Sequence, residues 1–129
     1  MTAAALDRAL VEAARLFRAR RFYEVHEVLE DVWRTLTGDR RVFVQGLIQI
    51  AAGFHHLARG KPRSAATLFA RGRAKLSAHA AETCGLDVTA LLTDLRPWEA
   101  AAAAGDVWDE SRALPRFLVR AAGGGDVGI

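Results

Sequence analysis

The sequence has few of the residues that interrupt helices or cross-link a chain. It contains 3 prolines and 11 glycines, and most of the glycines fall between predicted segments or near the C-terminus, whereas 26 residues are alanine. This composition favours helix and argues against a mainly β fold. The single cysteine, Cys84, cannot form an internal disulfide, which suits a reducing cytoplasm.

Long apolar runs are also missing. The longest mostly apolar stretch, from Val42 to Leu57, contains two glutamines and two histidines and is too short and too polar to span a bilayer. The first residues, MTAAALDRALVEAA, lack the basic and apolar regions of a signal peptide. We therefore expect a soluble, cytoplasmic protein that has no membrane partner.

Length and charge indicate one folded domain without a strong electrostatic preference. The 129 residues are 51% hydrophobic and 26% charged, which is enough apolar surface for a packed core. The net charge of +3 is a mild bias, and this total alone does not indicate a nucleic-acid partner.

Apolar spacing and helix breakers predict five helical segments. They cover residues 3–19, 22–36, 42–59, 62–82 and a last segment that begins near Asp87, a suitable N-cap. The inner stripe of the fourth segment consists of Ala65, Phe69, Gly72 and Leu76. In the fifth segment, Pro97 is expected to end or kink the helix, although the alanine-rich residues 98–104 also favour helix.

The chain after Gly105 reads as a tail on this helical domain, so we expect a single domain at residues 1–105 and a tail at 106–129. Apolar residues of the tail could dock on the bundle or on a second copy of the chain in a homodimer. These residues are Trp108, Leu114, Phe117 and Leu118. The end of the tail, from Gly123, is expected to be mobile.

A weak internal echo suggests how the helices pair. The segments around Ala14 and Ala52 are similar at an offset of 38 residues, close to the tetratricopeptide period of about 34. Two copies are too few for a solenoid. We therefore predict an all-α, compact bundle of five to six helices, made of two antiparallel, tetratricopeptide-like hairpins with a buried third helix.

Polar residues on the second and third helices are the main candidates for a functional site. Helical spacing places His26 and Glu30 on one face beside Trp33, with Glu27 and Asp31 directed toward water.

On the third helix, the same spacing aligns Gln45, Gln49 and His56, whereas His55 lies about 80° to 120° away from that stripe. The other sides of this helix are apolar, so we expect it to be central and its polar stripe to be buried. A short turn makes the two helices antiparallel neighbours. We predict one buried polar cluster of His26, Glu30, Trp33, Gln45, Gln49 and His56.

Three interpretations of this cluster remain open. It could be a hydrogen-bond network that fixes the register of two helices, with Glu30 also paired to Arg34. It could hold a divalent metal such as zinc or iron through His26, Glu30 and His56, although Glu30 occupies the position of the second histidine in the metalloprotease HExxH motif. It could also line a pocket for a small ligand, with His26 and Glu30 available for proton transfer.

A basic ridge is predicted on the fourth helix. Arg63, Arg71 and Lys75 are four or eight residues apart, which places them on one face. Such a ridge is either a solvated helix face or a surface for an anionic partner such as RNA. Exposed aromatics for base stacking are few and a glycine-rich phosphate loop is missing, so nucleic acid is disfavoured.

Two longer segments resemble a known family. RRFYEVHEVLEDVWR and FVQGLIQIAAGFHHLARGKPRSAATLFARGRAKL are similar to the small bacterial and archaeal family called domain of unknown function 309, over about Leu10 to Leu95. The resemblance implies an all-helical fold and a cytoplasmic setting, and it brings no activity, cofactor or catalytic residue with it.

The sequence is best interpreted as a small, non-enzymatic helical protein that binds a small ligand or a protein partner. The first alternative is a metal-dependent or acid/base enzyme that uses His26, Glu30 and His56. A more distant alternative is an RNA-associated protein that uses the basic ridge.

Overall fold

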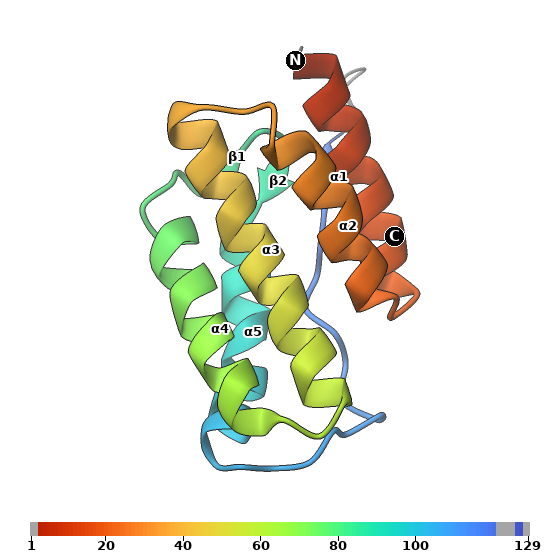
Figure 1. Ribbon diagram of the computed structural model, residues 1–129, viewed down its shortest axis with the longest axis vertical. Coiled ribbons are helices and arrows are strands. Elements are labelled where there is room, and N and C mark those ends of the chain that lie inside the picture. The colour runs from red at the N-terminus through yellow and green to blue at the C-terminus, as the bar shows by residue number, and fades with distance from the viewer. Residues whose placement is uncertain (1–2, 121–125, 128–129) are drawn as a thin grey trace.

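Five helices form most of the structure, a computed structural model that describes residues 3–120 and 126–127. They are α1 (Ala3–Arg18), α2 (Phe22–Trp33), α3 (Gly38–Ala58), α4 (Pro62–Leu76) and α5 (Val88–Ala103). Each helix packs against the next one along the chain. Figure 1 shows α3 in front, between α2 and α4, with α5 behind α4. The predicted all-helical bundle with a central third helix is confirmed, and none of the described helices has the length and apolar character needed to cross a membrane.

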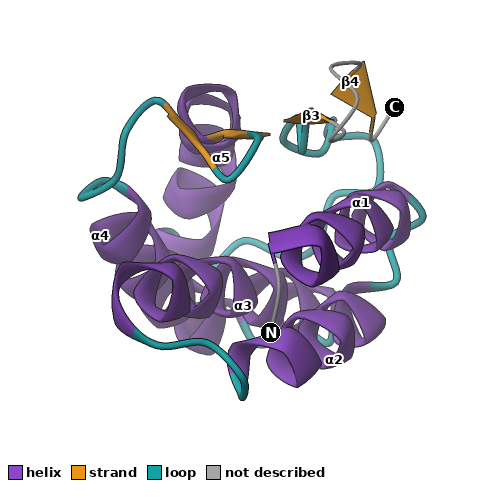
Figure 2. Ribbon diagram, turned by 90° about the horizontal axis from the view of Figure 1, so that it is seen from above, coloured by secondary structure: helices purple, strands orange, loops and turns teal. Residues whose placement is uncertain are grey.

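Each of the two similar sequence segments, around Ala14 and Ala52, belongs to a pair of packed helices. Packing joins α1 to α2 and α3 to α4, and α3 also contacts α2. Figure 2 shows the same order from above, with α3 between α2 and α4. The likeness of these pairs to tetratricopeptide hairpins remains a prediction.

The third helix begins four residues earlier than predicted. Thr37 is extended, with φ −136° and ψ 165°, and forms the N-cap, so the helix already includes Gly38 and Asp39. The carboxylate of Asp39 lies in the first turn, where the helix dipole favours a negative charge. The connection between α2 and α3 is therefore the short segment 34–37.

The fourth helix ends at Leu76 instead of residue 82, because the following residues join a small sheet. The carbonyl of Ala81 accepts hydrogen bonds from the backbone N–H groups of Val88 and Thr89 at the start of α5. This use of the carbonyl outweighs the helix propensity of the alanines before it.

The small sheet was not predicted, because strands of two residues are too short to show an alternating pattern. Four strands, β1 (Glu82–Thr83), β2 (Leu86–Asp87), β3 (Val119–Arg120) and β4 (Asp126–Val127), pair in that order and are antiparallel. Gly85 turns the first hairpin with φ +82°, and a Cβ atom there would lie 2.9 Å from the carbonyl oxygen of Arg120. Since β1 contacts α5 and β3 contacts α1, the sheet joins the first and last helices.

The fifth helix starts as predicted and continues past its proline. The side chain of Asp87 accepts a hydrogen bond from the backbone N–H of Ala90, which makes Asp87 the N-cap. The helix continues through Pro97 to Ala103, and Trp98 and Ala102 beyond the proline are buried in the core. Burial of these residues favours continuation, so of the outcomes left open the helix does not end at Pro97 but continues through the alanine-rich residues before Gly105.

Aromatic rings from every helix meet in the core. Phe54 of α3 contacts Phe17 of α1, Phe22 of α2, Phe69 of α4 and Trp98 of α5, with ring centroids 4.9–5.3 Å apart. Phe54 is fully buried. One ring on the central helix therefore contacts an aromatic residue of each of the other four.

The segment after α5, residues 104–120, lies against this core, and we call it the C-terminal strap. Trp108 packs 5.0 Å from Trp98, and buried Phe117 packs 5.4 Å from Phe17. Leu114 is half-buried against the same core. The predicted docking on the bundle thus occurs within one chain for these residues, and Leu118 is also half-buried. The predicted mobility from Gly123 falls mainly on residues 123–125 and 128–129, which lie outside the described residues.

Helices α3 and α4 approach closely at three glycines, Gly46, Gly53 and Gly72. A Cβ atom at Gly53 would lie 2.5 Å from the ring of Phe69, and one at Gly72 would lie 2.9 Å from the backbone oxygen of Gly46. Such distances are too short for any side chain, so glycine is what lets the two helices pack this closely.

Candidate functional site

A pocket forms between the first turns of α2 and the last turns of α3. These two helix ends lie toward the same end of the bundle in Figure 1. Its volume is about 120 Å³. The residues that line it are Tyr23, His26, Ala52, His55 and His56. We call it the histidine pocket, because it gathers three of the four histidines in the sequence.

Ring contacts hold the two sides of the pocket together. The ring of Tyr23 stacks on His26 with centroids 5.9 Å apart and planes 16° apart, and it lies 5.5 Å from the ring of His55. The rings of His55 and His56 are 6.1 Å apart. Tyr23 therefore bridges α2 and α3 across the mouth of the pocket.

Helical spacing explains how the sequence builds this pocket. Tyr23 and His26 are three residues apart on α2, and Ala52 is three and four residues before His55 and His56 on α3. Residues at these separations share a face of a helix. Antiparallel packing of the two helices then brings the two sets together.

Glu30 holds one histidine of the pocket in a defined orientation. Its Oε2 atom lies 3.2 Å from Nε2 of His26, and its Oε1 atom accepts a hydrogen bond of 2.7 Å from Arg34. The spacing along α2 predicted that His26 and Glu30 share a face, and the pairing of Glu30 with Arg34 was part of one interpretation of the cluster; both contacts are present.

Two imidazole nitrogens of the pocket lack a hydrogen-bond partner. Nδ1 of His26 on α2 and Nδ1 of His56 on α3 are both buried, and no described side chain or backbone group reaches either atom. A buried polar group left without a partner costs about 1 to 3 kcal/mol. The chain itself leaves these two groups unsatisfied at one site.

A second hollow, of about 280 Å³, lies on the outer side of α2. It is lined by Tyr23, His26, Glu27, Glu30, Asp31 and Arg34. Glu27 and Asp31 are exposed, as predicted. The paired rings of Tyr23 and His26 thus separate an acidic hollow from the histidine pocket.

The pKa of His55 lies below its usual value. Burial is the main cause, and the nearby positive charge of Arg59 adds to it, followed by His56, His26 and Lys61. A protonated His55 is therefore disfavoured in the folded protein.

We expect a pH dependence of stability from this shift. As the pH falls below about 6.5, the unfolded chain protonates His55 before the folded protein does, so the unfolded state gains stability. Thermal unfolding followed by circular dichroism between pH 8 and pH 5 should show wild type losing stability more steeply than His55→Gln. Equal slopes for the two proteins would contradict the lowered pKa of His55.

The two glutamines of the predicted cluster do not line the pocket. Gln49 accepts a hydrogen bond of 2.9 Å from Nζ of Lys75 on α4, and Gln45 makes no side-chain hydrogen bond with another described residue. Both are half-buried, and no polar or charged side chain in the described chain is fully buried. The prediction that these residues are buried in one cluster was therefore wrong. Helix α3 packs between α2 and α4, and its polar residues stay partly exposed, with Gln49 in contact with α4.

Trp33 is also separate from the pocket. The guanidinium of Arg41 lies 4.0 Å from the centroid of its ring, and Trp33 does not line the hollow on either side of His26. Sequence reasoning instead missed Tyr23 and gave His55 a marginal place. The separation of three residues between Tyr23 and His26 is the signal that could have identified the tyrosine.

The geometry does not support the predicted metal site. Within residues 3–120 and 126–127, no group of three or more His, Cys, Asp or Glu side chains is placed to hold a metal ion. Glu30 is already bound to His26 and Arg34, whereas His56 lines the pocket on the opposite side of the His26 ring. His26, Glu30 and His56 therefore do not converge on a common point.

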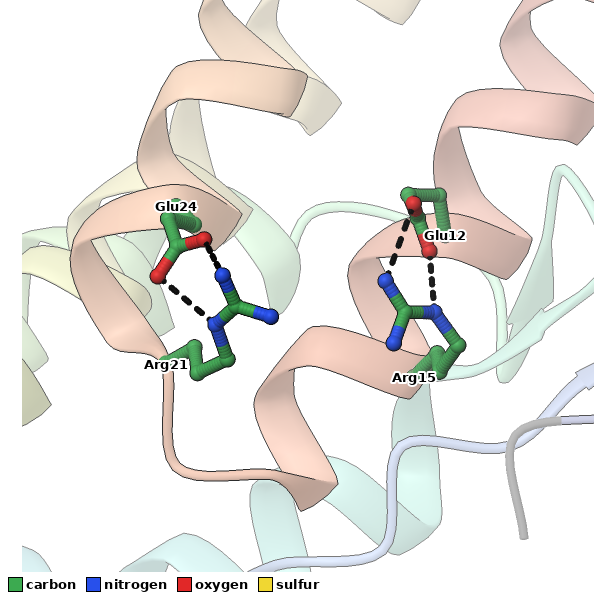
Figure 3. Close-up of polar contacts among 4 residues, drawn as sticks. All are labelled: Glu12, Arg15, Arg21 and Glu24. Carbon is green, nitrogen blue, oxygen red and sulfur yellow. Dashed lines mark hydrogen bonds and ion pairs between the residues drawn. The ribbon is translucent and has the colours of Figure 1, made fainter.

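The acids near the turn between α1 and α2 are engaged in surface ion pairs. Figure 3 shows Glu12 bound to Arg15 on α1, and Glu24 bound to Arg21 at the start of α2. The hydrogen bond from Arg15 lowers the pKa of Glu12. These exposed carboxylates are occupied by arginines of their own segments, which leaves Glu27 as the unpaired carboxylate of α2 among the described residues.

The basic ridge of α4 is only partly free. Arg63 and Arg71 are exposed, but Lys75 donates its hydrogen bond to Gln49, and neighbouring Arg73 is bound to Glu99 at 2.6 Å. The ridge thus presents two arginines to solvent instead of the three predicted cations.

Part of the chain matches the model of a known protein family. No curated protein matches the chain. The family model described as "Domain of unknown function (DUF309)" matches residues 10–68, which confirms the resemblance seen in the sequence, although the match ends within α4 instead of at Leu95. Residues 10–68, fewer than half of the 129 in the chain, are therefore similar to this family, and they include every residue of the histidine pocket.

Proposed function

We propose that the protein is a small helical binding protein, without enzymatic activity, whose histidine pocket binds a small polar ligand. One observation carries the proposal. His26 of α2 and His56 of α3 line the same pocket, and the Nδ1 atom of each is buried without a hydrogen-bond partner. A ligand with hydrogen-bonding atoms would satisfy groups that the chain leaves unsatisfied.

The size and chemistry of the pocket define what it can accept. A volume of about 120 Å³ is smaller than most pockets for whole cofactors, so it suits a small molecule or the polar end of a larger one. Imidazole and phenol groups can both donate and accept hydrogen bonds. The half-exposed ring of Tyr23 offers an apolar wall beside these polar groups.

Binding is proposed ahead of acid/base catalysis because no carboxylate lines the pocket to act as a second acid or base. Glu30, which lies beside His26, is also paired to Arg34 and lines the separate hollow on α2.

A reducing compartment fits the single cysteine. Cys84 is half-buried, and burial raises the pKa of its thiol. The group is therefore a poorly reactive thiol at neutral pH. This supports the cytoplasmic setting that we propose for the protein.

Binding can be tested with four small probes of different charge: acetate, sulfate, glycerol and methylammonium. The ¹⁵N signals of the histidine side chains are followed by NMR during each titration. We expect at least one probe to shift the signals of the pocket histidines until they saturate, while His79, which lies three residues after the end of α4, does not change.

A matched pair of variants controls this experiment. Ala52→Leu places a larger side chain in the pocket, whereas Ala58→Leu adds the same atoms at an exposed position of the same helix. Binding should be lost in Ala52→Leu and retained in Ala58→Leu, with both variants folded by circular dichroism. The proposal is wrong if no probe gives a saturable shift, or if Ala52→Leu still binds as wild type does.

A further inference from the structure

The groups that line the histidine pocket favour a negatively charged ligand. They are three imidazoles, a phenol and an alanine methyl group, and no carboxylate is among them. The nearest acid, Glu30, lines the separate hollow on the other side of the His26 ring. An anion in the pocket would therefore meet hydrogen-bond donors and no acidic side chain.

Two further cations lie near the pocket. Arg59, the C-cap of α3, and Lys61 lie three and five residues after His56; both are exposed, and neither pairs with an acid among the described residues. Both are near enough to His55 to contribute to its lowered pKa, although burial is the largest cause. The unpaired charges near His55 at the end of α3 are therefore positive.

The helix ends do not reverse this balance. The pocket combines the N-terminal turns of α2, where the dipole is positive, with the last turn of α3, where it is negative. These two contributions oppose each other. The sign of the site is consequently set by its side chains, which are His26, His55, His56, Arg59 and Lys61.

We infer that the ligand of the histidine pocket is an oxyanion, such as a carboxylate or a phosphate-like group, and that a pocket histidine takes up a proton when it binds. This inference rests on the proposed function and specifies its ligand. His26 is already oriented by Glu30, with Arg34, Glu27 and Asp31 nearby. No carboxylate lines the pocket beside His55, and Arg59 and Lys61 lie near it, so a bound anion changes the charge around His55 most and the proton is assigned to His55.

Proton uptake follows from the chemistry of the imidazole group. A neutral imidazole offers one N–H donor, and a protonated imidazole offers two. In the free protein, burial and the neighbouring cations oppose protonation of His55. The negative charge of a bound anion stabilises the protonated imidazole and so offsets both effects. Binding of the anion and protonation of His55 therefore favour each other.

The test uses sulfate and acetate, with glycerol and methylammonium as uncharged and cationic references, at constant ionic strength. The charge of sulfate is constant between pH 6.5 and pH 7.5, so any change in its affinity reports protonation of the protein. We expect the ¹⁵N signals of His55 to shift toward the protonated form. The affinity for sulfate should rise by up to about tenfold when the pH is lowered from 7.5 to 6.5, because one proton taken up on binding allows at most a tenfold change per pH unit.

Two substitutions that remove one positive charge each locate the site. Lys61→Gln should weaken sulfate binding about two- to fivefold, the effect of losing one exposed charge contact. Arg71→Gln, at an exposed position of the basic ridge on α4, should leave it unchanged. Equal weakening in both variants, or a shift of His79 as large as that of His55, would show that sulfate responds only to overall charge and would overturn the inference.

The remaining outcomes separate the inference from the proposed function. Saturable binding of glycerol or methylammonium, with no binding of either anion, would overturn the anion inference and leave the binding function standing. Anion binding that is independent of pH would overturn proton uptake. Absence of binding by all four probes would overturn both proposals together.

Discussion

Phe54→Ala is expected to lower the free energy of unfolding by about 3 to 5 kcal/mol, the usual range when a buried phenylalanine is truncated to alanine. The ring is fully buried and contacts aromatic residues of the other four helices, so no single neighbour can move to fill the space. Domains of this kind are stable by only about 5 to 15 kcal/mol. The expected loss is therefore a large fraction of the total stability.

Urea denaturation followed by tryptophan fluorescence and circular dichroism measures this loss. Val42→Ala is the matched control, because Val42 lies on the same helix but is 42% exposed. It should change the free energy of unfolding by about 0.5 kcal/mol or less. A similar loss in both variants would mean that Phe54 is not the centre of the core.

Gly72→Val should cost about 2 to 3 kcal/mol, because the close contact between α3 and α4 has no room for a side chain. A Cβ atom at this position would lie 2.6 Å from the Cδ1 atom of Ile50 and 2.9 Å from the backbone oxygen of Gly46. The isoleucine end can rotate away. The backbone oxygen can move only if the two helices separate.

Ala74→Val is the control for this prediction, since Ala74 is exposed on the same helix. Its cost should be limited to the weaker helix propensity of valine, about 0.5 kcal/mol. Thermal and urea unfolding of the two variants should therefore differ clearly. If Gly72→Val is as stable as Ala74→Val, the two helices are not held at the distance described above.

The fold was largely predictable where side chains repeat with helical spacing. The four residues predicted for the inner stripe of α4, Ala65, Phe69, Gly72 and Leu76, are its buried residues. Spacing succeeds here because one face of each helix must be buried. It could not predict the end of α4, which depends on the carbonyl of Ala81 finding partners at the start of α5.

The candidate site was predictable in part, for the same reason. The pairing of His26 with Glu30 lies within one helix and follows from its spacing. The contacts of the side chains on α3 cannot be predicted from spacing, because spacing gives the direction of a side chain but not the helix that it contacts. Gln49 therefore contacts Lys75 of α4 instead of a residue of α2, and His55 enters the pocket through its ring contact with Tyr23.

The C-terminal strap determines which part of the molecule is expected to unfold first. Most helix contacts join neighbours in the chain, so each closes a short loop, whereas the contact between Phe17 and Phe117 closes almost the whole described chain. The entropy lost on closing a loop grows with its length. Under mild denaturation, the strap should accordingly detach before the helix pairs melt, giving proteases a first point of attack at the edge of the aromatic core.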